Sequence, residues 1–290
     1  MISIIITVFN RQETIEAAIE SCLTQDFSDY EVVIVDDGST DQSSDKIKKY
    51  IGGKVRYFYQ NNQGAAAAKN RGVKEARYEY ITFLDSDDVF YSSNVLSRIF
   101  STFDCNPDFI CADRILIRKR ECDTVSLNKQ ICSDSDFYKN MILSPLNYAG
   151  HNPYVFRKKM FLQIGGFDVN SKWGDALIFW RRFFKHHPKT IVIKEVGYIY
   201  NQVNNDSISR KRNSEYYLKA LDVIYRCYLE NKKDVFAIKG EKNWELIMFY
   251  YAIKAKSMAK SIEMFMILCS GRFYFIPKAL KYLFFTKVMK

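Results

Sequence analysis

Residues 80–88 have the sequence YITFLDSDD, an apolar run that stops abruptly at three carboxylates. The run Tyr80–Leu84 is rich in β-branched and aromatic side chains, which is typical of a buried strand. Asp85, Asp87 and Asp88 follow at the point where that strand would end. The segment therefore predicts a strand that delivers charged groups to one edge of a sheet.

The chain before this segment repeats one pattern three times. Apolar runs predict strands at Ile2–Val8, Glu31–Val35 and Val55–Tyr59. Helices are predicted over residues 12–24, where apolar residues recur at helical spacing, over residues 41–50, which follow a capping residue at Thr40 or Asp41, and over the alanine-rich residues 64–76. Strands that alternate with helices form a parallel sheet with helices on both faces, and such sheets bind ligands at the carboxyl ends of their strands. We therefore expect an α/β fold with a site at that edge.

The three carboxylates after the fourth strand allow two interpretations. Like charges repel, so a cluster of this kind is costly unless a cation offsets it. Magnesium and manganese prefer oxygen ligands and bind through one or two carboxylates together with substrate phosphates. Alternatively, an aspartate at a strand-to-helix turn caps the helix. Both interpretations stay open on these residues alone, and the position at the end of a central strand favours the metal.

A second pair of carboxylates, Asp36 and Asp37, ends the second predicted strand and precedes Gly38. A carboxylate at this place accepts hydrogen bonds from a ribose or a base in dinucleotide folds, whereas an Asp-Gly pair on its own also forms an ordinary turn. The sequence contains neither a GxGxxG motif after the first strand nor a GxxxxGK[ST] loop. These absences argue against a nicotinamide dehydrogenase and a P-loop NTPase.

A third signal lies in residues 165–182, where GGFD is followed by WGDALIFWRR. Asp175 falls where a helix would begin, so it is either a helix cap or a general base that faces the cleft. Trp173 either stacks on a sugar ring or packs in the core. The sequence leaves both pairs of alternatives open.

Charge and composition restrict the class of partner. The 290 residues carry a net charge of +10, and the segment 254–290 holds eight basic residues against one acid. The rest is nearly balanced, which argues against a nucleic-acid-binding body. The seven cysteines form no CxxC pair, so a reducing cytosol fits best. The basic, aromatic C-terminal segment either packs on the catalytic domain or contacts an anionic membrane surface.

In this order, the motifs resemble those of the family 2 glycosyltransferases with the GT-A fold. The resemblance runs from residue 2 to about residue 209 and is closest to the SpsA-like, inverting, non-processive branch. It comprises TVFN at the end of the first strand, DDGS, the NxGxxxAxN pattern of residues 62–70, LDSDD, GGFD, the carboxylate that opens the FWR helix, and YNQVNNDSIS.

The resemblance implies a GT-A type, Rossmann-like, mostly parallel sheet with flanking helices plus a C-terminal helical extension. We expect a catalytic domain over residues 1–205, with a nucleotide-sugar half over about 1–100 and an acceptor half over about 101–205. Residues 206–290 would form a helical, basic and membrane-associating region.

The resemblance also implies the roles of individual residues. A nucleotide-sugar donor, in particular a UDP-sugar, would be held by Thr7, Phe9, Arg11, Asp36, Asp37, Lys69 and Asp85. A divalent metal, manganese or magnesium, would be bound by Asp87 and Asp85. Asp175 would be the base that deprotonates the acceptor hydroxyl, and Trp173 and Asp168 would contact the acceptor.

Two departures from the family pattern bear on the acceptor and the closing loop. Gly174 replaces a common glutamate before the base, and Asn201 and Gln202 stand where a histidine is frequent. No QxxRW follows Asp175, which favours transfer of one sugar over processive synthesis.

We expect a cytoplasmic enzyme, peripheral at the inner face of the plasma membrane, that extends a glycan or lipid-linked oligosaccharide of O-antigen or capsule type. A sugar nucleotidyltransferase and a non-catalytic nucleotide-sugar-binding scaffold are the alternatives.

Overall fold

The computed structural model describes residues 1–117, 122–125, 134–143, 154–171, 174–201 and 213–269. The chain divides into two compact units. The first consists of Met1–Phe137, Gly150–Asn170 and Asp175–Asn205, and the second of Tyr138–Ala149, Ser171–Gly174 and Asp206–Lys290. Each unit is described by itself below.

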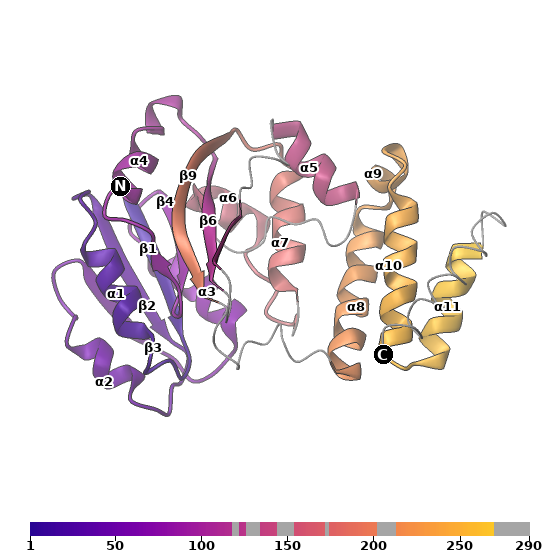
Figure 1. The fold of residues 1–290 in the computed structure, drawn as a ribbon, viewed down its shortest axis with the longest axis horizontal. Coiled ribbons are helices and arrows are strands. Elements are labelled where there is room, and N and C mark those ends of the chain that lie inside the picture. Colours follow the sequence, from indigo (N-terminus) through magenta and orange to yellow (C-terminus); the bar gives the residue numbers. More distant parts are fainter. Residues whose placement is uncertain (118–121, 126–133, 144–153, 172–173, 202–212, 270–290) are drawn as a thin grey trace. The chain divides into compact units, whose positions relative to one another are not determined.

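The described strands of the first unit form one nine-stranded sheet (Figure 1). Its order is β3-β2-β1-β4-β8-β6-β9-β5, and β7 pairs with β6. The strands are β1 (Ile2–Val8), β2 (Tyr30–Asp36), β3 (Val55–Tyr59), β4 (Tyr80–Asp85), β5 (Val89–Phe90), β6 (Phe109–Ile117), β7 (Cys122–Val125), β8 (Tyr154–Arg157) and β9 (Thr190–Asn201). The first four are mutually parallel, as their alternation with helices predicts.

The helices of this unit are α1 (Ile15–Leu23), α2 (Ser43–Lys48), α3 (Ala65–Glu75), α4 (Val95–Phe100), α6 (Lys158–Ile164) and α7 (Asp175–Phe184), with a 3₁₀ turn at Phe103–Cys105. Alternate residues of β1 face different helices. Ile4 and Ile6 join the core cluster that contains the buried face of α1. Ile5 points the other way and meets Gly72 of α3. Because both faces of the strand are covered, every position from Ile2 to Ile6 is buried, which explains why the strand is apolar except for Ser3, whose hydroxyl donates to Glu31.

The second half of the sheet differs from the simple parallel pattern. Strand β8 lies between β4 and β6 and is antiparallel to both, while β6 and β9 run parallel. The sequence also predicts short strands at residues 108–112 and 191–196, and the structure contains both as the longer strands β6 and β9. Their extra length comes from continued pairing beyond an irregularity at Ala112 and Asp113.

Aromatic side chains fill the space between this half of the sheet and helices α6 and α7. Phe156 of β8 contacts Phe161 of α6 with ring centroids 5.8 Å apart and Trp180 of α7 at 5.7 Å. Phe109 of β6 meets Phe184 edge to face at 4.9 Å. Aromatic pairs in such geometries contribute about 0.5–1.5 kcal/mol beyond their buried area. This cluster accounts for much of the high aromatic content and fixes α7 on the sheet.

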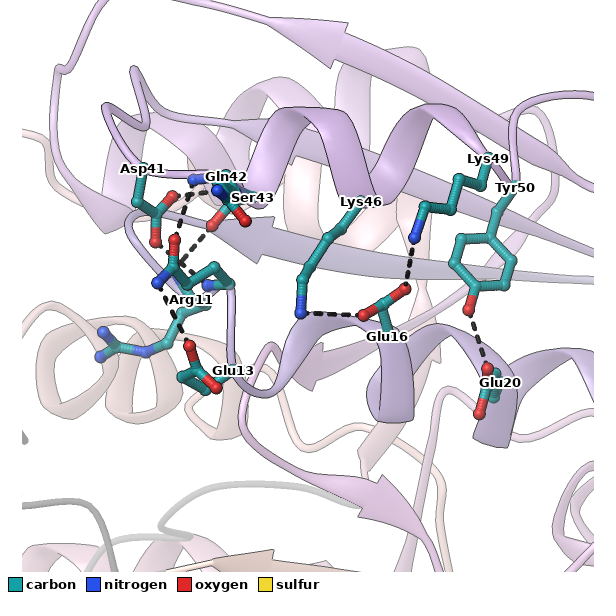
Figure 2. Close-up of polar contacts among 11 residues, drawn as sticks. Arg11, Glu13, Glu16, Glu20, Asp41, Gln42, Ser43, Lys46, Lys49 and Tyr50 are labelled. Atoms are coloured by element: carbon teal, nitrogen blue, oxygen red, sulfur yellow. Dashed lines mark hydrogen bonds and ion pairs between the residues drawn. The ribbon is translucent and has the colours of Figure 1, made fainter.

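Polar contacts join α1 and α2 at the surface (Figure 2). The Glu16 carboxylate accepts hydrogen bonds from Lys46 and Lys49, with ion-pair distances of 2.9 and 3.2 Å. These two lysines hold the pKa of Glu16 below its ordinary value. One helical turn further, the Tyr50 hydroxyl donates to Glu20 Oε1 over 2.8 Å. The two helices that follow β1 and β2 are therefore held in register with each other.

The second unit is helical. It contains the end of α5 (Asp134–Leu143) together with α8 (Ser214–Glu230), α9 (Lys232–Ala237), α10 (Glu241–Lys254) and α11 (Met258–Cys269). Trp244 is fully buried, and its indole Nε1 donates to the backbone oxygen of Ile142 over 2.7 Å. The sequence predicts one continuous helix over residues 242–260. This prediction is wrong, because α10 ends at Lys254 and Lys256 adopts a left-handed φ of 54°. None of the helices within the described residues is long and apolar enough to span a membrane.

Candidate active site

The candidate site lies at the carboxyl ends of β1 and β4. The chain places β2 and β3 on one side of β1 and β4 on the other, so the strand order reverses between β1 and β4. Open α/β sheets bind ligands at such a reversal. Thr7, which is half-buried, pairs in register with Asp85. The predicted Thr7 and Asp85 are thus adjacent across the two strands.

The loop after β1 is fixed by the loop after β2. Asn10 adopts a left-handed φ of 51°, which asparagine tolerates better than most residues. Its backbone N–H donates to Ser39 Oγ over 3.1 Å, and its side-chain oxygen accepts from the Thr40 N–H over 2.8 Å. The Arg11 N–H donates to Ser43 Oγ over 2.8 Å (Figure 2).

This loop carries two of the predicted donor-binding residues. Phe9 is 46% exposed, so its ring is available to a ligand. Arg11 Nε lies 4.0 Å from Asp87 Oδ2, which brings the loop after β1 to the turn after β4. The structure therefore brings Phe9, Arg11 and Asp87 to the same edge of the sheet as Thr7 and Asp85.

Asp36 ends β2 and is completely buried. Its carboxylate accepts hydrogen bonds from the Ser39 N–H at 2.8 Å, the Ser44 hydroxyl at 2.5 Å and the Tyr57 hydroxyl at 2.9 Å. Burial, and secondarily the charge of Asp36, raises the pKa of Tyr57 to about 12. Asp36 therefore organises the loop that holds Asn10 and Arg11. A direct contact with the nucleotide stays a prediction.

Asp37 is also buried and joins β2 to the start of α3. Its carboxylate accepts from Gln60 Nε2 at 2.7 Å and from the backbone N–H groups of Gln63 at 2.9 Å and Gly64 at 2.8 Å. Gly38 next to it has φ +79°, and a Cβ there would lie 2.8 Å from the Asn62 nitrogen. The DDGS motif is thus a tightly packed turn in this structure, whether or not it also binds a ligand.

Lys69 of α3 brings the charges of the site together. Its Nζ lies 3.6 Å from Asp85 Oδ1. Burial lowers the pKa of the ammonium, but the carboxylates of Asp85, Asp175 and Asp88 outweigh this effect, and the pKa is raised above its ordinary value. Lys69 is therefore charged at neutral pH. It lies within electrostatic reach of both the donor-side carboxylate Asp85 and the predicted base Asp175.

The carboxylates after β4 form a turn and do not cap a helix. The Asp88 N–H donates to the Asp85 oxygen over 3.0 Å, and the next element is the short strand β5. This removes the helix-cap interpretation. Within the described ranges, no three His, Cys, Asp or Glu side chains gather as a metal-binding cluster. Asp85 and Asp87 still fit a cation that takes one or two carboxylates and completes its shell with substrate phosphates.

The structure describes two of the three predicted acceptor-side residues, and the role of each, including Asp175 as the base, stays a prediction. Asp175 is the first residue of α7 and is half-buried. Asp168 is half-buried, and its Oδ1 accepts the Asn170 N–H over 3.0 Å. Trp173 lies outside the described residues. Contacts of Asp168 and Trp173 with an acceptor stay predictions.

Sequence reasoning did not single out Asn70. Its Nδ2 donates to the Phe167 oxygen over 2.8 Å, and its Oδ1 accepts from the Phe167 N–H over 2.8 Å. One side chain thus satisfies both backbone groups of a residue 97 positions away. Asn70 ends the NxGxxxAxN pattern, so the motif marked the residue but gave no sign of its partner.

Comparison with known proteins identifies the type of site. The model of Glycosyl transferase family 2 matches residues 3–170. An uncharacterised glycosyltransferase of Rickettsia felis is 46% identical over 95 residues, which is 32% of this chain and 16% of that protein. The GalNAc(5)-diNAcBac-PP-undecaprenol beta-1,3-glucosyltransferase of Campylobacter jejuni is 27% identical over 236 residues, covering 80% of this chain and 73% of the relative. The chain therefore spans about a sixth of the Rickettsia relative and about three quarters of the Campylobacter one.

Solved structures confirm the predicted fold class. TarS 1–349 of S. aureus, in complex with UDP-GlcNAc, has a TM-score of 0.63 at 19% identity and covers 97% of this chain and 79% of that one. The mannosyltransferase PcManGT of Pyrobaculum calidifontis, in complex with GDP-Man and Mn²⁺, has a TM-score of 0.60 at 14% identity, covering 99% and 79%. At these identities the likeness establishes the fold alone, which is the GT-A type with a helical C-terminal region.

Proposed function

The chain belongs to glycosyl transferase family 2 and is a glycosyltransferase; from this premise we propose that it moves one sugar from a UDP-sugar to a hydroxyl of a lipid-linked glycan precursor. The observation that carries the proposal is the placement of Lys69, whose ammonium lies near Asp85 at the end of β4 and interacts with Asp175 at the start of α7. Donor-side and acceptor-side carboxylates thus share one cation. Family membership favours this reaction over nucleotidyl transfer and over a non-catalytic scaffold.

The donor would lie across the carboxyl ends of β1, β2 and β4. The exposed ring of Phe9 would stack on the base, and the cations Arg11 and Lys69 would face the diphosphate. The hydrogen bonds from the base or ribose would be accepted by Thr7, Asp36, Asp37 and Asp85. A UDP-sugar is supported by the TarS complex with UDP-GlcNAc, a protein that shares the fold.

A divalent cation would be held by Asp87 and Asp85. When bound, such a cation neutralises the diphosphate and stabilises the negative charge of the departing UDP. In the structure, Arg11 Nε lies 4.0 Å from Asp87 Oδ2 and Lys69 Nζ lies 3.6 Å from Asp85 Oδ1. The Mn²⁺ complex of PcManGT, which shares the fold, supports manganese as the first cation to test.

Asp175 would act as the general base. Its carboxylate would accept the proton of the acceptor hydroxyl while that oxygen attacks the anomeric carbon from the face opposite UDP. The bond from the anomeric carbon to the diphosphate oxygen breaks, UDP leaves with the electron pair, and one displacement inverts the anomeric centre. The ammonium of Lys69, which interacts with Asp175, would lie near the carboxylate that takes this proton.

The acceptor is proposed from the chemistry of relatives and from a surface on the second unit. The Campylobacter relative is named for an undecaprenol-linked acceptor. Met258, Ile262 and Met266 recur every four residues along α11 and are 80, 58 and 63% exposed. The segment that contains them, residues 254–290, is strongly basic. We infer peripheral contact with anionic lipid, since each basic residue near such a surface adds about 1 kcal/mol.

This organisation gives the predicted regions their tasks. Residues 1–100 would bind the donor, residues 101–205 would present the base to the acceptor, and residues 206–290 would hold the enzyme at the cytoplasmic face of the membrane. The product would be a cell-surface glycan precursor of O-antigen or capsule type, extended by one sugar.

A donor panel tests the reaction. The purified protein is incubated with UDP-glucose, UDP-galactose, their N-acetyl forms, UDP-glucuronate and GDP-mannose, each with manganese or with EDTA. We expect slow, metal-dependent release of UDP from one donor. Asp175→Asn should keep UDP binding but lose a factor of about 10²–10⁴ in turnover, which is the typical contribution of a general base. Full turnover by this variant would remove the assignment of the base.

Vesicle flotation tests the membrane surface. The wild type should float with vesicles of anionic lipid and not with vesicles of phosphatidylcholine. Ile262→Glu should lose the association, whereas Leu229→Glu, at a position 52% exposed on α8, should keep it. Flotation of Ile262→Glu at the level of the wild type would contradict the proposed surface.

A further inference from the structure

The loop that leads toward α7 is attached to α3 by a single side chain. Both polar atoms of the Asn70 amide are used, Nδ2 toward the Phe167 oxygen and Oδ1 toward the Phe167 N–H, each over 2.8 Å. Because both partners are backbone groups, the contact fixes the path of the chain at residue 167 whatever its side chain does. A side chain in the donor half of the domain thereby sets the position of a loop in the acceptor half.

The neighbouring glycine shows how closely the loop approaches Asn70. Gly166 has φ +71°, and a Cβ at this position would lie 2.6 Å from Asn70 Oδ1 and 2.9 Å from Phe161 Cε1. Both the backbone conformation and the space exclude a larger residue. The loop therefore rests directly on the amide, with no room for another residue at position 166.

The residue that Asn70 holds packs between the two candidate catalytic elements. The Phe167 ring lies 5.6 Å from the ring of Phe83 and 4.7 Å from that of Phe179. Phe83 stands two residues before Asp85 on β4, and Phe179 stands one helical turn after Asp175 on α7. A shift of residue 167 would therefore move α7 relative to the end of β4.

We propose that Asn70 is a positioning residue, which sets the place of Asp175 relative to the donor-side carboxylates by fixing Phe167. This inference rests on the proposed function of Asp175. Asn70 itself touches neither the donor nor the acceptor in this scheme. Its loss would misplace the base rather than remove a ligand contact, and a displacement of about 1 Å at a reacting group can cost a factor of about 10² in rate.

The decisive variant is Asn70→Ala, which removes both hydrogen bonds. We expect kcat for sugar transfer to fall by a factor of about 10–100, while KM for the donor and the calorimetric affinity for UDP with manganese stay within about threefold. The control is Asn213→Ala, which removes the side chain that accepts the Tyr216 N–H over 2.8 Å at the start of α8. It should lower the melting temperature without changing kcat.

Hydrogen exchange provides a readout that does not depend on activity. In the wild type the Phe167 amide is protected by Asn70, and in Asn70→Ala we expect faster exchange there and in the first turn of α7. Unchanged exchange in α7 would overturn the positioning role, whatever donor the enzyme uses. Failure of the proposed function would instead appear as an Asp175→Asn variant with full turnover.

Two further outcomes would also overturn the inference. One is a parallel loss of UDP affinity and kcat in Asn70→Ala, which would make Asn70 a donor-binding residue. The other is an equal loss of kcat in Asn70→Ala and Asn213→Ala, which would leave only general destabilisation. Gly166→Ala would disturb the same contact by placing a Cβ against Asn70 Oδ1. Because the two residues touch, the effects of Gly166→Ala and Asn70→Ala on kcat should be non-additive.

Discussion

Replacing Lys69 by methionine tests the electrostatic centre of the candidate site. The substitution keeps most of the length and the apolar stem of the side chain and removes the charge. Lys69 lies 3.6 Å from Asp85, and the two side chains are 17 and 24% exposed. Without the ammonium, the carboxylates of Asp85, Asp175 and Asp88 would lose their attraction to Lys69, and their mutual repulsion would be less compensated. We therefore expect Lys69→Met to lose both stability and affinity for UDP.

The geometry gives the magnitude. Two charges about 4 Å apart near a protein surface attract by about 4 kcal/mol at an effective dielectric constant of 20. Part of this is offset by desolvation of the ammonium, which opposes the raised pKa of Lys69. Removing one partner of a fully buried pair costs about 3–5 kcal/mol, and this pair retains some contact with solvent. We expect a loss of about 2 kcal/mol in the free energy of unfolding at neutral pH.

The loss of affinity is a separate quantity. A hydrogen bond between a charged group and its partner contributes about 1.5–3 kcal/mol. If the ammonium contacts the diphosphate, UDP should bind about 10- to 100-fold more weakly to Lys69→Met, since each 1.4 kcal/mol is tenfold. Isothermal titration with UDP and manganese measures this change, and urea denaturation measures the change in stability.

A matched control and a second substitution make the test specific. Lys74→Met changes an exposed lysine on the same helix and should alter stability by less than about 0.5 kcal/mol. Adding Asp85→Asn to Lys69→Met removes the carboxylate that lost its ion pair with Lys69, so the double variant should be more stable than additivity predicts, by about 1 kcal/mol. Wild-type affinity for UDP together with strictly additive stabilities would refute the reasoning.

Two further predictions concern the scaffold. The pKa of Glu16 is held below 4.5 by Lys46 and Lys49, so its contribution to stability is present above that pH and is lost as pH falls through the lowered value. Glu16→Gln should therefore be less stable than the wild type at neutral pH and converge with it in acid, and a constant difference in urea titrations across this range would contradict the prediction. Gly72→Ala should cost about 1–3 kcal/mol in the same assay, because its Cβ would lie 2.4 Å from Ile5 Cγ2 and overpacking exceeds the gain in helix propensity; an equally stable variant would show that α3 can move away from β1.

The first half of the fold was predictable because three of its four strands, β1, β2 and β4, are buried on both faces. The predicted bounds of Ile2–Val8 and Val55–Tyr59 agree with the structure, whereas β2 is longer than predicted by one residue at each end and β4 by one residue at its C-terminal end. Strand β8 was not predicted. It has only four residues, and what makes it a strand is its pairing with β4 and β6, elements that are distant along the chain. Local pattern carries no information about such partners.

The candidate site likewise has one part that the sequence predicted and one part that it did not. The edge argument predicted that groups after β1 and β4 would lie together, and the contacts of Arg11 with Asp87 and of Lys69 with Asp85 agree with it. The two hydrogen bonds between Asn70 and Phe167 could not be predicted. They join residues 97 positions apart, and they depend on a loop conformation that requires glycine at position 166. A sequence motif identifies residues that matter without showing which backbone group each one meets.

Burial separates carboxylates that the sequence motifs treat alike. Asp36 and Asp37 are 0 and 3% exposed, and each accepts three hydrogen bonds from the protein. A carboxylate offers about four acceptor positions, so each retains about one for a ligand. Asp85 and Asp87 have side chains 24 and 22% exposed, and each lies beside a cation that a diphosphate would also attract. The diphosphate of a donor would therefore compete with these carboxylates for Arg11 and Lys69, and a metal would compete with the two cations for the carboxylates. Binding would rearrange these exposed pairs and leave Asp36 and Asp37 as the frame.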